Sequence, residues 1–242
     1  MLTLSLLALA ACQYNVDHAD RAFYNGDERK VHCAIDIDSY ARISAASIET
    51  GLDRAQQRGE VLELYTHEPG VTVAWNTIET VLAGAQARGL SFVTYADIAN
   101  GTHINGGGLA LSFDDSSLSS WLAGRELFER YRARLTFFVS NWKPSMREGL
   151  RALAADGHDI EPHSVHHLRG PVVVEERGLA AYLSEEIVPS IEVLRNDGFA
   201  ASVFAYPYGA RTSETDRAIL EHVSVLRSVA FAWDSPATDP CP

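Results

Sequence analysis

Short apolar segments and longer helix-like segments alternate along almost the whole chain. We expect strands where apolar or alternating residues run for a few positions, at 31–38, 61–67, 91–95, 109–115, 135–140, 158–164, 201–206 and 225–231. We expect helices between them, at 43–58, 75–88, 117–131, 145–155, 174–195 with an interruption near Pro189, and 213–223. This alternation predicts a parallel sheet in an α/β fold. So many consecutive units favour a distorted (β/α) barrel of about seven strands over an open sheet.

Polar side chains collect where these strands end. In parallel barrels the chemistry lies at the C-terminal ends of the strands. Those ends carry Asp36, Asp38, His67, Asp114, Asp115, His163, His166, His167 and the run Tyr206 to Tyr208. A barrel would bring these groups to one end of the molecule.

The strand at 109–115 is apolar until it ends in Asp114 and Asp115. Successive side chains of a strand face opposite sides, so the two carboxylates are expected to have different roles. Buried acids are costly without a cation against them. The alternatives are a solvated loop or a cap for the helix that follows Ser116.

Three histidines follow the strand at 158–164. His163 and His167 are four positions apart, so both imidazoles can reach one ion if the chain turns there. Two imidazoles and one carboxylate form a three-ligand site with open positions, which is the usual form of a catalytic zinc. His166 is a competing ligand that the spacing does not exclude, and surface histidines in a loop are the alternative.

The net charge and the N-terminal segment limit which partners and which cellular location we expect for the protein. A formal net charge of −12 argues against a nucleic-acid partner. Residues 1–12 have no charged side chain and end in Leu9-Ala10-Ala11-Cys12, which resembles a bacterial lipoprotein signal without its basic start. We expect a signal peptide at 1–12 with lipid on Cys12, a polar tether at 13–30 and one domain at 31–242. The residue after the cysteine is Gln13 rather than Asp, which favours the periplasmic face of the outer membrane.

Export would place the other two cysteines in an oxidising compartment. Cys33 and Cys241 are then expected to form a disulfide between the first strand and the end of the chain.

Several segments together resemble the polysaccharide deacetylases, also called carbohydrate esterase family 4 or NodB homology domains. Ser112 to Asp115 is similar to the family's first motif, His163 to His167 fits His-Ser/Thr-x-x-His, and Ala205 to Gly209 resembles Arg-x-Pro-Tyr. The lead-in Gly157 to Ile160 also resembles the family pattern. The match covers about residues 109–209.

The resemblance implies a role for each matching residue. Asp114 would be the general base, and Asp115, His163 and His167 would hold zinc or another divalent metal. The backbone N–H of Tyr208 would stabilise the oxyanion. The family's motif-three arginine is replaced here by Ala205, and Arg211 is a candidate substitute.

The two remaining motifs lie at the front of the chain. The run Leu64 to His67 resembles the motif that supplies the general acid, His67. The strand from Cys33 to Asp38 resembles the motif with its supporting Asp, for which Asp36 is the better match and Asp38 lies on the same strand face. The motif order four, five, one, two, three indicates a circular permutation, which a barrel tolerates because it closes on itself.

The resemblance implies an enzyme that removes N-acetyl groups from a polysaccharide containing N-acetylglucosamine. We expect a carbohydrate substrate, a lipid anchor as the only membrane contact, and a monomer. The alternatives are a non-catalytic glycan-binding lipoprotein on the same barrel, suggested by Ala205, and an O-acetyl esterase or deformylase.

Overall fold

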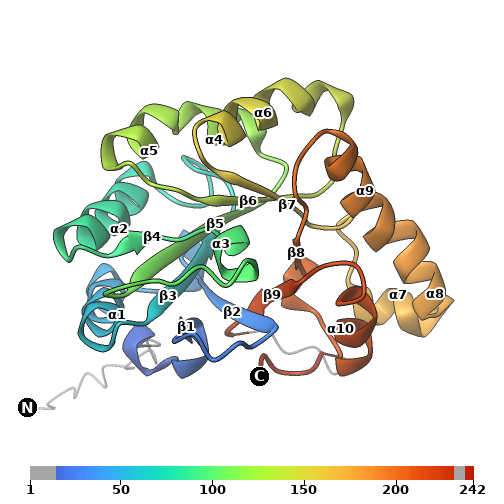
Figure 1. Ribbon diagram of the computed structural model, residues 1–242, viewed down its shortest axis with the longest axis horizontal. Coiled ribbons are helices and arrows are strands. Elements are labelled where there is room, and N and C mark those ends of the chain that lie inside the picture. Colours follow the sequence, from blue (N-terminus) through green and yellow to red (C-terminus); the bar gives the residue numbers. More distant parts are fainter. Residues whose placement is uncertain (1–14, 232–237) are drawn as a thin grey trace, which may run out of the picture.

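A computed structural model of the protein describes residues 15–231 and 238–242. Parallel strands pair in the order β7-β6-β5-β3-β2-β9-β8 and curve into a barrel whose helices lie outside it (Figure 1). The strands are β2 (Val31–Asp36), β3 (Val61–Thr66), β5 (Gly108–Asp115), β6 (Thr136–Val139), β7 (Asp159–Pro162), β8 (Val203–Ala205) and β9 (Val225–Val229). The predicted (β/α) barrel is confirmed.

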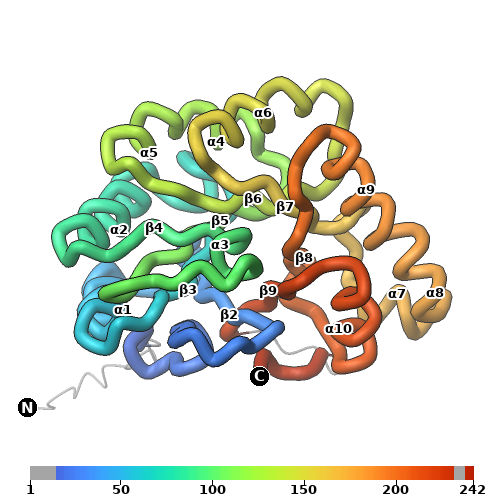
Figure 2. Tube along the Cα trace, viewed as in Figure 1, coloured from blue at the N-terminus to red at the C-terminus, as the bar shows by residue number. Residues whose placement is uncertain are grey.

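The strand order explains the unusual order of the motifs. A path around the barrel that starts at β5 meets β6, β7, β8 and β9, and then β2 and β3, which bring it back to β5. The strands that come first in the chain therefore occupy the last positions of the barrel, as the trace in Figure 2 shows. A circular permutation produces this arrangement.

The barrel is completed between β7 and β8 by a side chain rather than by strand pairing. Glu161 of β7 is fully buried, and its carboxylate accepts hydrogen bonds from the backbone N–H of Val203 at 2.9 Å and of Ser202 at 3.2 Å. Burial raises the pKa of Glu161 well above its usual range. The carboxyl group thus satisfies edge donors of β8 that a neighbouring strand would otherwise bind.

Helices cover the outside of the barrel in chain order. They are α1 (Ala45–Arg58), α2 (Trp75–Ala87), α4 (Leu118–Ala123), α5 (Arg125–Tyr131), α6 (Arg147–Ala155), α7 (Gly170–Arg177), α8 (Leu179–Tyr182), α9 (Val188–Asn196) and α10 (Ser213–Ile219). The helix expected at 117–131 is two helices that meet at Gly124, where an added Cβ would lie 2.5 Å from Phe128. The long helix expected at 174–195 is divided by Gly178 and by a π-helical turn, η5 (Leu183–Ile187), just before Pro189.

The prediction of a polar tether at 13–30 is wrong for the described part of that segment. Two 3₁₀ turns, η1 (Val16–His18) and η2 (Asp20–Ala22), lead into β1 (Phe23–Tyr24), which pairs antiparallel with β3. Val16 is fully buried, its N–H donates to Ser47 Oγ at 2.8 Å, and the Arg54 guanidinium stacks on Phe23 at 3.8 Å. Few apolar residues mark this segment, but Val16 and Phe23 suffice to pack it on the barrel.

The strand expected at 91–95 is also shorter than predicted. β4 covers only Ser91–Phe92 at the edge of β5, and α3 (Tyr95–Ala99) begins soon afterwards. Thr94 and Asp97 form a capping box at the start of α3, which ends the strand early.

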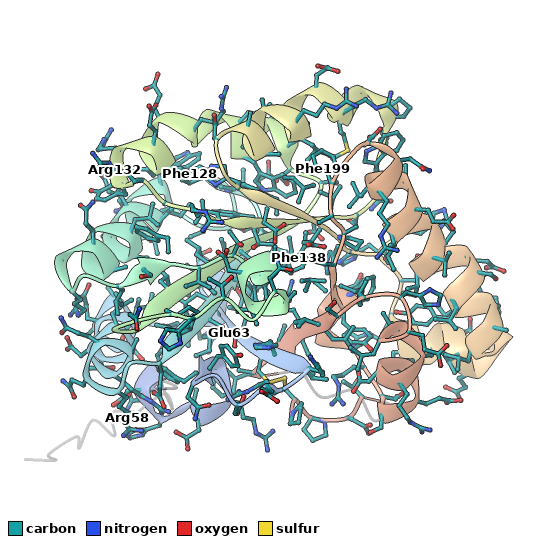
Figure 3. All side chains as sticks on the ribbon, in the orientation of Figure 1. Arg58, Glu63, Phe128, Arg132, Phe138 and Phe199 are labelled. Carbon is teal, nitrogen blue, oxygen red and sulfur yellow. A yellow bond between two sulfur atoms is a disulfide. The ribbon has the colours of Figure 1, made fainter. Side chains whose placement is uncertain are left out.

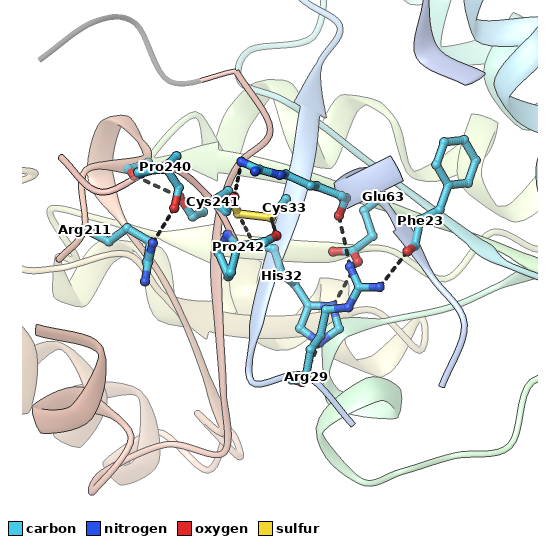
Figure 4. Close-up of a disulfide and its surroundings, with 12 residues drawn as sticks. Phe23, Arg29, His32, Cys33, Glu63, Arg211, Pro240, Cys241 and Pro242 are labelled. Atoms are coloured by element: carbon cyan, nitrogen blue, oxygen red, sulfur yellow. Dashed lines mark hydrogen bonds and ion pairs between the residues drawn. A yellow bond between two sulfur atoms is a disulfide. The ribbon is translucent and has the colours of Figure 1, made fainter. Parts of the chain in front are cut away.

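The predicted disulfide is present and ties the C-terminal segment to β2. Cys33 and Cys241 are bonded with their Cα atoms 6.0 Å apart, across 208 positions of sequence (Figure 4). The carbonyl of Cys241 accepts from Arg21, and that of Pro240 accepts from Arg211 at 2.6 Å. The bridge therefore joins the ends of the permuted domain, next to the paired strands β2 and β9.

The barrel interior is filled by large apolar side chains and a few paired polar ones. Phe138 and Glu63, both fully buried, lie in the central part of Figure 3. Glu63 accepts from Tyr95 Oη at 2.8 Å and pairs with His32 Nδ1 at 2.9 Å. Within the described residues, no helix is both long and apolar enough to span a bilayer.

Candidate active site

The predicted site residues meet at the C-terminal end of the barrel. Asp38 follows β2, His67 follows β3, Asp114 and Asp115 end β5, and the run from His163 to His167 follows β7. Tyr208 lies in a turn after β8. The C-terminal ends of the parallel strands lie at one rim of the barrel, so residues far apart in sequence become neighbours.

The first group, which we call the Asp115 cluster, consists of Asp115, His163 and His167. One ligand atom from each of them lies within 4.8 Å of the others. Asp115 Oδ1 is 3.1 Å from His167 Nε2 and 3.8 Å from His163 Nε2. The three side chains predicted to hold a metal are therefore brought together.

The protonation of the Asp115 cluster suits a cation. His163 is buried, and this burial lowers the pKa of its imidazole to about 3, so the ring is neutral. Its Nδ1 lies 2.8 Å from the carbonyl oxygen of Ala205, which can only accept, so Nδ1 carries the proton and Nε2 offers its lone pair. Asp115 Oδ1 is buried and makes no hydrogen bond within the described residues. These donors fit a divalent cation.

His166, the competing ligand, is not part of this cluster. Its Nδ1 lies 2.7 Å from Glu186 Oε1. Two residues of the loop, Ser164 and His167, have left-handed backbone conformations, with φ of +66° and +57°. The turn that His163 and His167 needed in order to converge is made by these two residues.

Asp114 is held by an arginine that the sequence prediction missed. The Arg227 guanidinium of β9 donates to Asp114 Oδ2, and both side chains are buried. Burial alone would raise the pKa of Asp114, but the charge of Arg227 lowers it below the usual value, which keeps the carboxylate ionised. Arg227 Cζ lies 4.9 Å from the rings of both Tyr65 and Phe138, which hold the guanidinium between them.

The position of Arg227 explains the missing motif-three arginine. In the parallel pairing of β8 and β9, Ala205 is the direct partner of Arg227. The guanidinium thus comes from the adjacent strand at the same level of the barrel. The candidate substitute Arg211 instead binds Asp216 and the carbonyl of Pro240. An arginine inside the apolar run 225–229 was the available sequence signal, because a charge is rarely buried in a strand without a partner.

The second group, the His67 cluster, consists of Asp36, Asp38 and His67, again with ligand atoms within 4.8 Å. Asp38, rather than Asp36, contacts His67 Nδ1 through Oδ2, so the preference for Asp36 as the supporting carboxylate is corrected. Asp36 Oδ1 accepts from the N–H of Asp38 at 2.8 Å. Asp36 ends β2 and Asp38 lies beyond it, where the chain leaves the strand and can turn toward His67.

The carboxylate of Asp38 is buried and fully engaged. Its Oδ1 accepts from the hydroxyls of Thr66 and of Thr72, the latter at 2.7 Å, and its Oδ2 accepts from Tyr40 at 2.9 Å. Burial by itself disfavours a charged His67, but the bond to Asp38 and the charges of Asp114 and Asp115 raise its pKa to about 9. His67 is therefore protonated at neutral pH, as a general acid must be.

Tyr208 borders the Asp115 cluster. Its ring centroid is 4.7 Å from that of His167, and it adopts φ of +60° directly after Pro207. Half of its surface is exposed, and Arg169 lies over its ring at 4.6 Å. The turn thus carries the Tyr208 backbone to the edge of the cluster.

Known proteins resemble this chain in sequence and in fold. Residues 104–223 match the sequence model of the family described as polysaccharide deacetylase. No curated protein sequence matches the chain. The de-N-acetylase from Aggregatibacter actinomycetemcomitans is similar in structure, with a TM-score of 0.58 and 14% identity over 69% of this chain and 86% of that one. The Streptococcus pyogenes deacetylase PplD has a TM-score of 0.55 and 16% identity over 66% of this chain and 78% of that one.

The family match covers β5 to β8, which carry Asp114, Asp115, His163, His167 and Tyr208. The two structural neighbours show the same fold. The residues before 104 supply His67 and Asp38 to the same rim. Residues 104–223 therefore belong to the polysaccharide deacetylase family of hydrolases.

Proposed function

We propose that the protein is a metal-dependent deacetylase that removes N-acetyl groups from a polysaccharide containing N-acetylglucosamine. One observation carries the proposal. The Asp115 cluster, which can bind a cation, lies at the same barrel rim as an ionised Asp114 and a protonated His67. Hydrolysis of an amide needs a base for the water and an acid for the amine. The rim offers one of each.

Asp115, His163 and His167 would hold the divalent cation, with zinc the first candidate. A cation bound there would lower the pKa of water and polarise the acetyl carbonyl. Asp115 Oδ1, which makes no hydrogen bond within the described residues, and the neutral His163 support this assignment.

The side chains around that position have complementary roles. Asp114, oriented by Arg227, accepts a proton from the attacking water through its free oxygen Oδ1, which makes no hydrogen bond within the described residues. The backbone N–H of Tyr208 donates to the oxygen that becomes negative in the transition state. His67, fixed through Nδ1 by Asp38, donates a proton from Nε2 to the departing nitrogen. The products are acetate and a free amine.

The test is acetate release from N-acetylglucosamine oligomers by the zinc-loaded protein, with and without a chelator. Asp114→Asn and His67→Gln should each lower the rate by about 10²- to 10⁴-fold, the usual contribution of a general base or acid. Circular dichroism would confirm that both variants fold. Zinc-replete wild-type protein that releases no acetate from any acetylated glycan would refute the proposal.

A substrate panel separates N-deacetylation from the esterase alternative. An alkoxide leaves more readily than an amide nitrogen, so ester hydrolysis depends less on a proton from His67. We expect His67→Gln to lose far more activity on an N-acetyl than on an O-acetyl glycan. The alternative of a non-catalytic binding protein rested on Ala205, and the Arg227–Asp114 pair supplies the charge that Ala205 lacks.

We also propose that the protein is held at the cell envelope by lipid on Cys12. The signal-like residues 1–12 lie outside the described residues, so the support comes from their sequence and from the Cys33–Cys241 disulfide, which fits an oxidising compartment. Labelling with a radioactive fatty acid should mark the wild-type protein and not Cys12→Ser. Equal labelling of both would remove the anchor, and fractionation of the envelope would locate the membrane.

A further inference from the structure

Glu186 is a buried carboxylate whose side-chain hydrogen bonds go to the histidine loop. Only 1% of its surface is exposed, and glutamate is rarely buried to this extent unless its carboxylate is paired. Its Oε2 accepts from the backbone N–H of His166 at 2.8 Å, and its Oε1 lies 2.7 Å from His166 Nδ1. Its own carbonyl accepts from the N–H of Val165 at 3.1 Å. One residue therefore binds the loop at three points.

The helix that carries Glu186 has an unusual turn at this position. η5 (Leu183–Ile187) is π-helical and ends two positions before Pro189. Pro189 has no N–H to donate to the carbonyl of Glu185, four positions earlier, and its ring crowds that carbonyl. Widening the turn relieves this conflict, and π-helical turns are frequent at functional sites. The turn presents Glu186 to the loop.

The loop needs such support because its conformation is strained. Ser164 and His167 adopt left-handed conformations, which are strained for residues other than glycine. The N–H of His163 is held by Val139 at 2.9 Å and that of His167 by Ser164 Oγ at 3.0 Å. Between them, Glu186 accepts from the N–H groups of Val165 and His166. Without its carboxylate, His166 would lose both contacts that fix it, while the backbone of Val165 would keep its bonds to the Glu186 carbonyl and the Asn141 N–H.

Glu186 also determines the surroundings of the third histidine. His166 could compete with its neighbours for a cation, since its side chain is 65% exposed. Its imidazole is instead held against Glu186, while His163 and His167 face Asp115. We propose that Glu186 is a positioning residue of the metal site, which fixes the loop so that His163 and His167, and not His166, bind the cation. This inference rests on the metal dependence proposed above.

Glu185 provides a matched control on the same turn. It is adjacent in sequence and of the same residue type, but it is half exposed and pairs with Arg177 at the surface. Replacing it removes a carboxylate from η5 without touching the loop. A change seen for Glu186 and not for Glu185 therefore reports on the loop contacts.

The experiment measures zinc affinity by competition with a chromophoric chelator, and the melting temperature of the metal-free proteins. We expect Glu186→Ala and Glu186→Asp to bind zinc about 10- to 100-fold more weakly, the usual effect of removing a group that orients metal ligands. Glu186→Gln can still accept from the His166 N–H and should stay within about threefold of the wild type. Glu185→Ala should match the wild type.

The shorter side chain of Glu186→Asp keeps the charge, so this variant decides the question if Glu186→Ala does not fold. Folded Glu186→Asp with wild-type zinc affinity would overturn the role of Glu186. Equal losses in Glu186→Gln and Glu186→Asp would overturn it too, since the retained hydrogen bond would then have no effect. A wild-type protein that binds no zinc would instead overturn the proposed metal dependence, and the role of Glu186 with it.

Discussion

The Asp115 cluster and the His67 cluster each combine carboxylates with imidazoles whose ligand atoms lie within 4.8 Å. In the Asp115 cluster the buried His163 is neutral, with a pKa of about 3, and a carboxylate oxygen is left without a hydrogen bond among the described residues. In the His67 cluster the imidazole is charged, with a pKa of about 9. Burial disfavours the charged form of both imidazoles, and only in His67 does a carboxylate, that of Asp38 at Nδ1, offset this effect; the Nδ1 of His163 contacts the neutral carbonyl of Ala205.

Surrounding groups therefore decide what similar side chains do. A carbonyl partner leaves a neutral ring ready to bind a cation, whereas a carboxylate partner stabilises the imidazolium that donates a proton. The Asp38 carboxylate has no free capacity for a cation because Thr66, Thr72 and Tyr40 occupy it as well. We therefore predict that, of the two clusters, the Asp115 cluster binds the metal.

The largest effect should come from removing a ligand of the Asp115 cluster. Asp115→Ala should lose tight zinc binding and at least about 10³-fold in deacetylase activity, because a metal hydrolase without its ion has neither activated water nor a polarised carbonyl. Zinc titration and acetate release measure the two losses. His67→Gln is the comparison variant and should keep zinc affinity. A larger loss of zinc binding in His67→Gln than in Asp115→Ala would reverse the assignment of the clusters.

The next largest effect should come from the base that lies between the two clusters. Arg227→Met leaves Asp114 buried without its cation, which should cost about 3–5 kcal/mol of folding stability and lower activity by about 10²-fold. Urea unfolding and acetate release check both effects. Arg211→Met breaks another buried pair, with Asp216, and should cost stability while sparing most of the activity. Similar activity losses in the two variants would mean that Arg227 has no special relation to the base.

The pH dependence tests the charge of the His67 cluster. Protonated His67 is required, so activity should fall as the pH rises through about 9, and Asp38→Asn should move this fall toward the ordinary histidine value near 6.5. Asp36→Asn, the matched change two positions earlier, should move it little. The raised pKa also stabilises the fold below about pH 6.5, and this stabilisation is lost as the pH rises through about 9. Identical profiles for the two variants would restore Asp36 as an equal candidate.

The smallest effect on catalysis should come from the disulfide, which anchors the strand leading to the His67 cluster. Cys33→Ser with Cys241→Ser should lower folding stability by about 3–5 kcal/mol, because the bridge closes a loop of most of the chain. Zinc affinity should stay unchanged, since the Asp115 cluster lies on other strands. Calorimetry and zinc titration measure the two quantities. A loss of zinc affinity greater than the loss of stability would show that the clusters are coupled.

Much of the fold and site was predictable from the sequence. Alternating strands and helices predicted the barrel, and the rule that chemistry lies at strand ends gathered the candidate side chains. The resemblance to the deacetylase motifs then singled out Asp114, Asp115, His67, His163 and His167. The barrel prediction was confirmed because hydrophobic periodicity is a local property of the sequence, and the candidate side chains converge because the strand ends share one rim. The disulfide followed from cysteine counting in the same way.

Tertiary structure decided which partners meet. Arg227 replaces the motif-three arginine because β8 and β9 pair in a register that places it beside Ala205, and no local pattern encodes that register. The choice of Asp38 over Asp36 depends on where the chain leaves β2. The burial of residues 16–24 depends on α1 and β3, which come later in the chain. The position of the His166 side chain depends on Glu186, in a π-helical turn about twenty positions away. The sequence specifies the residue types, but the charge of each titratable side chain depends on neighbours that only folding brings close to it.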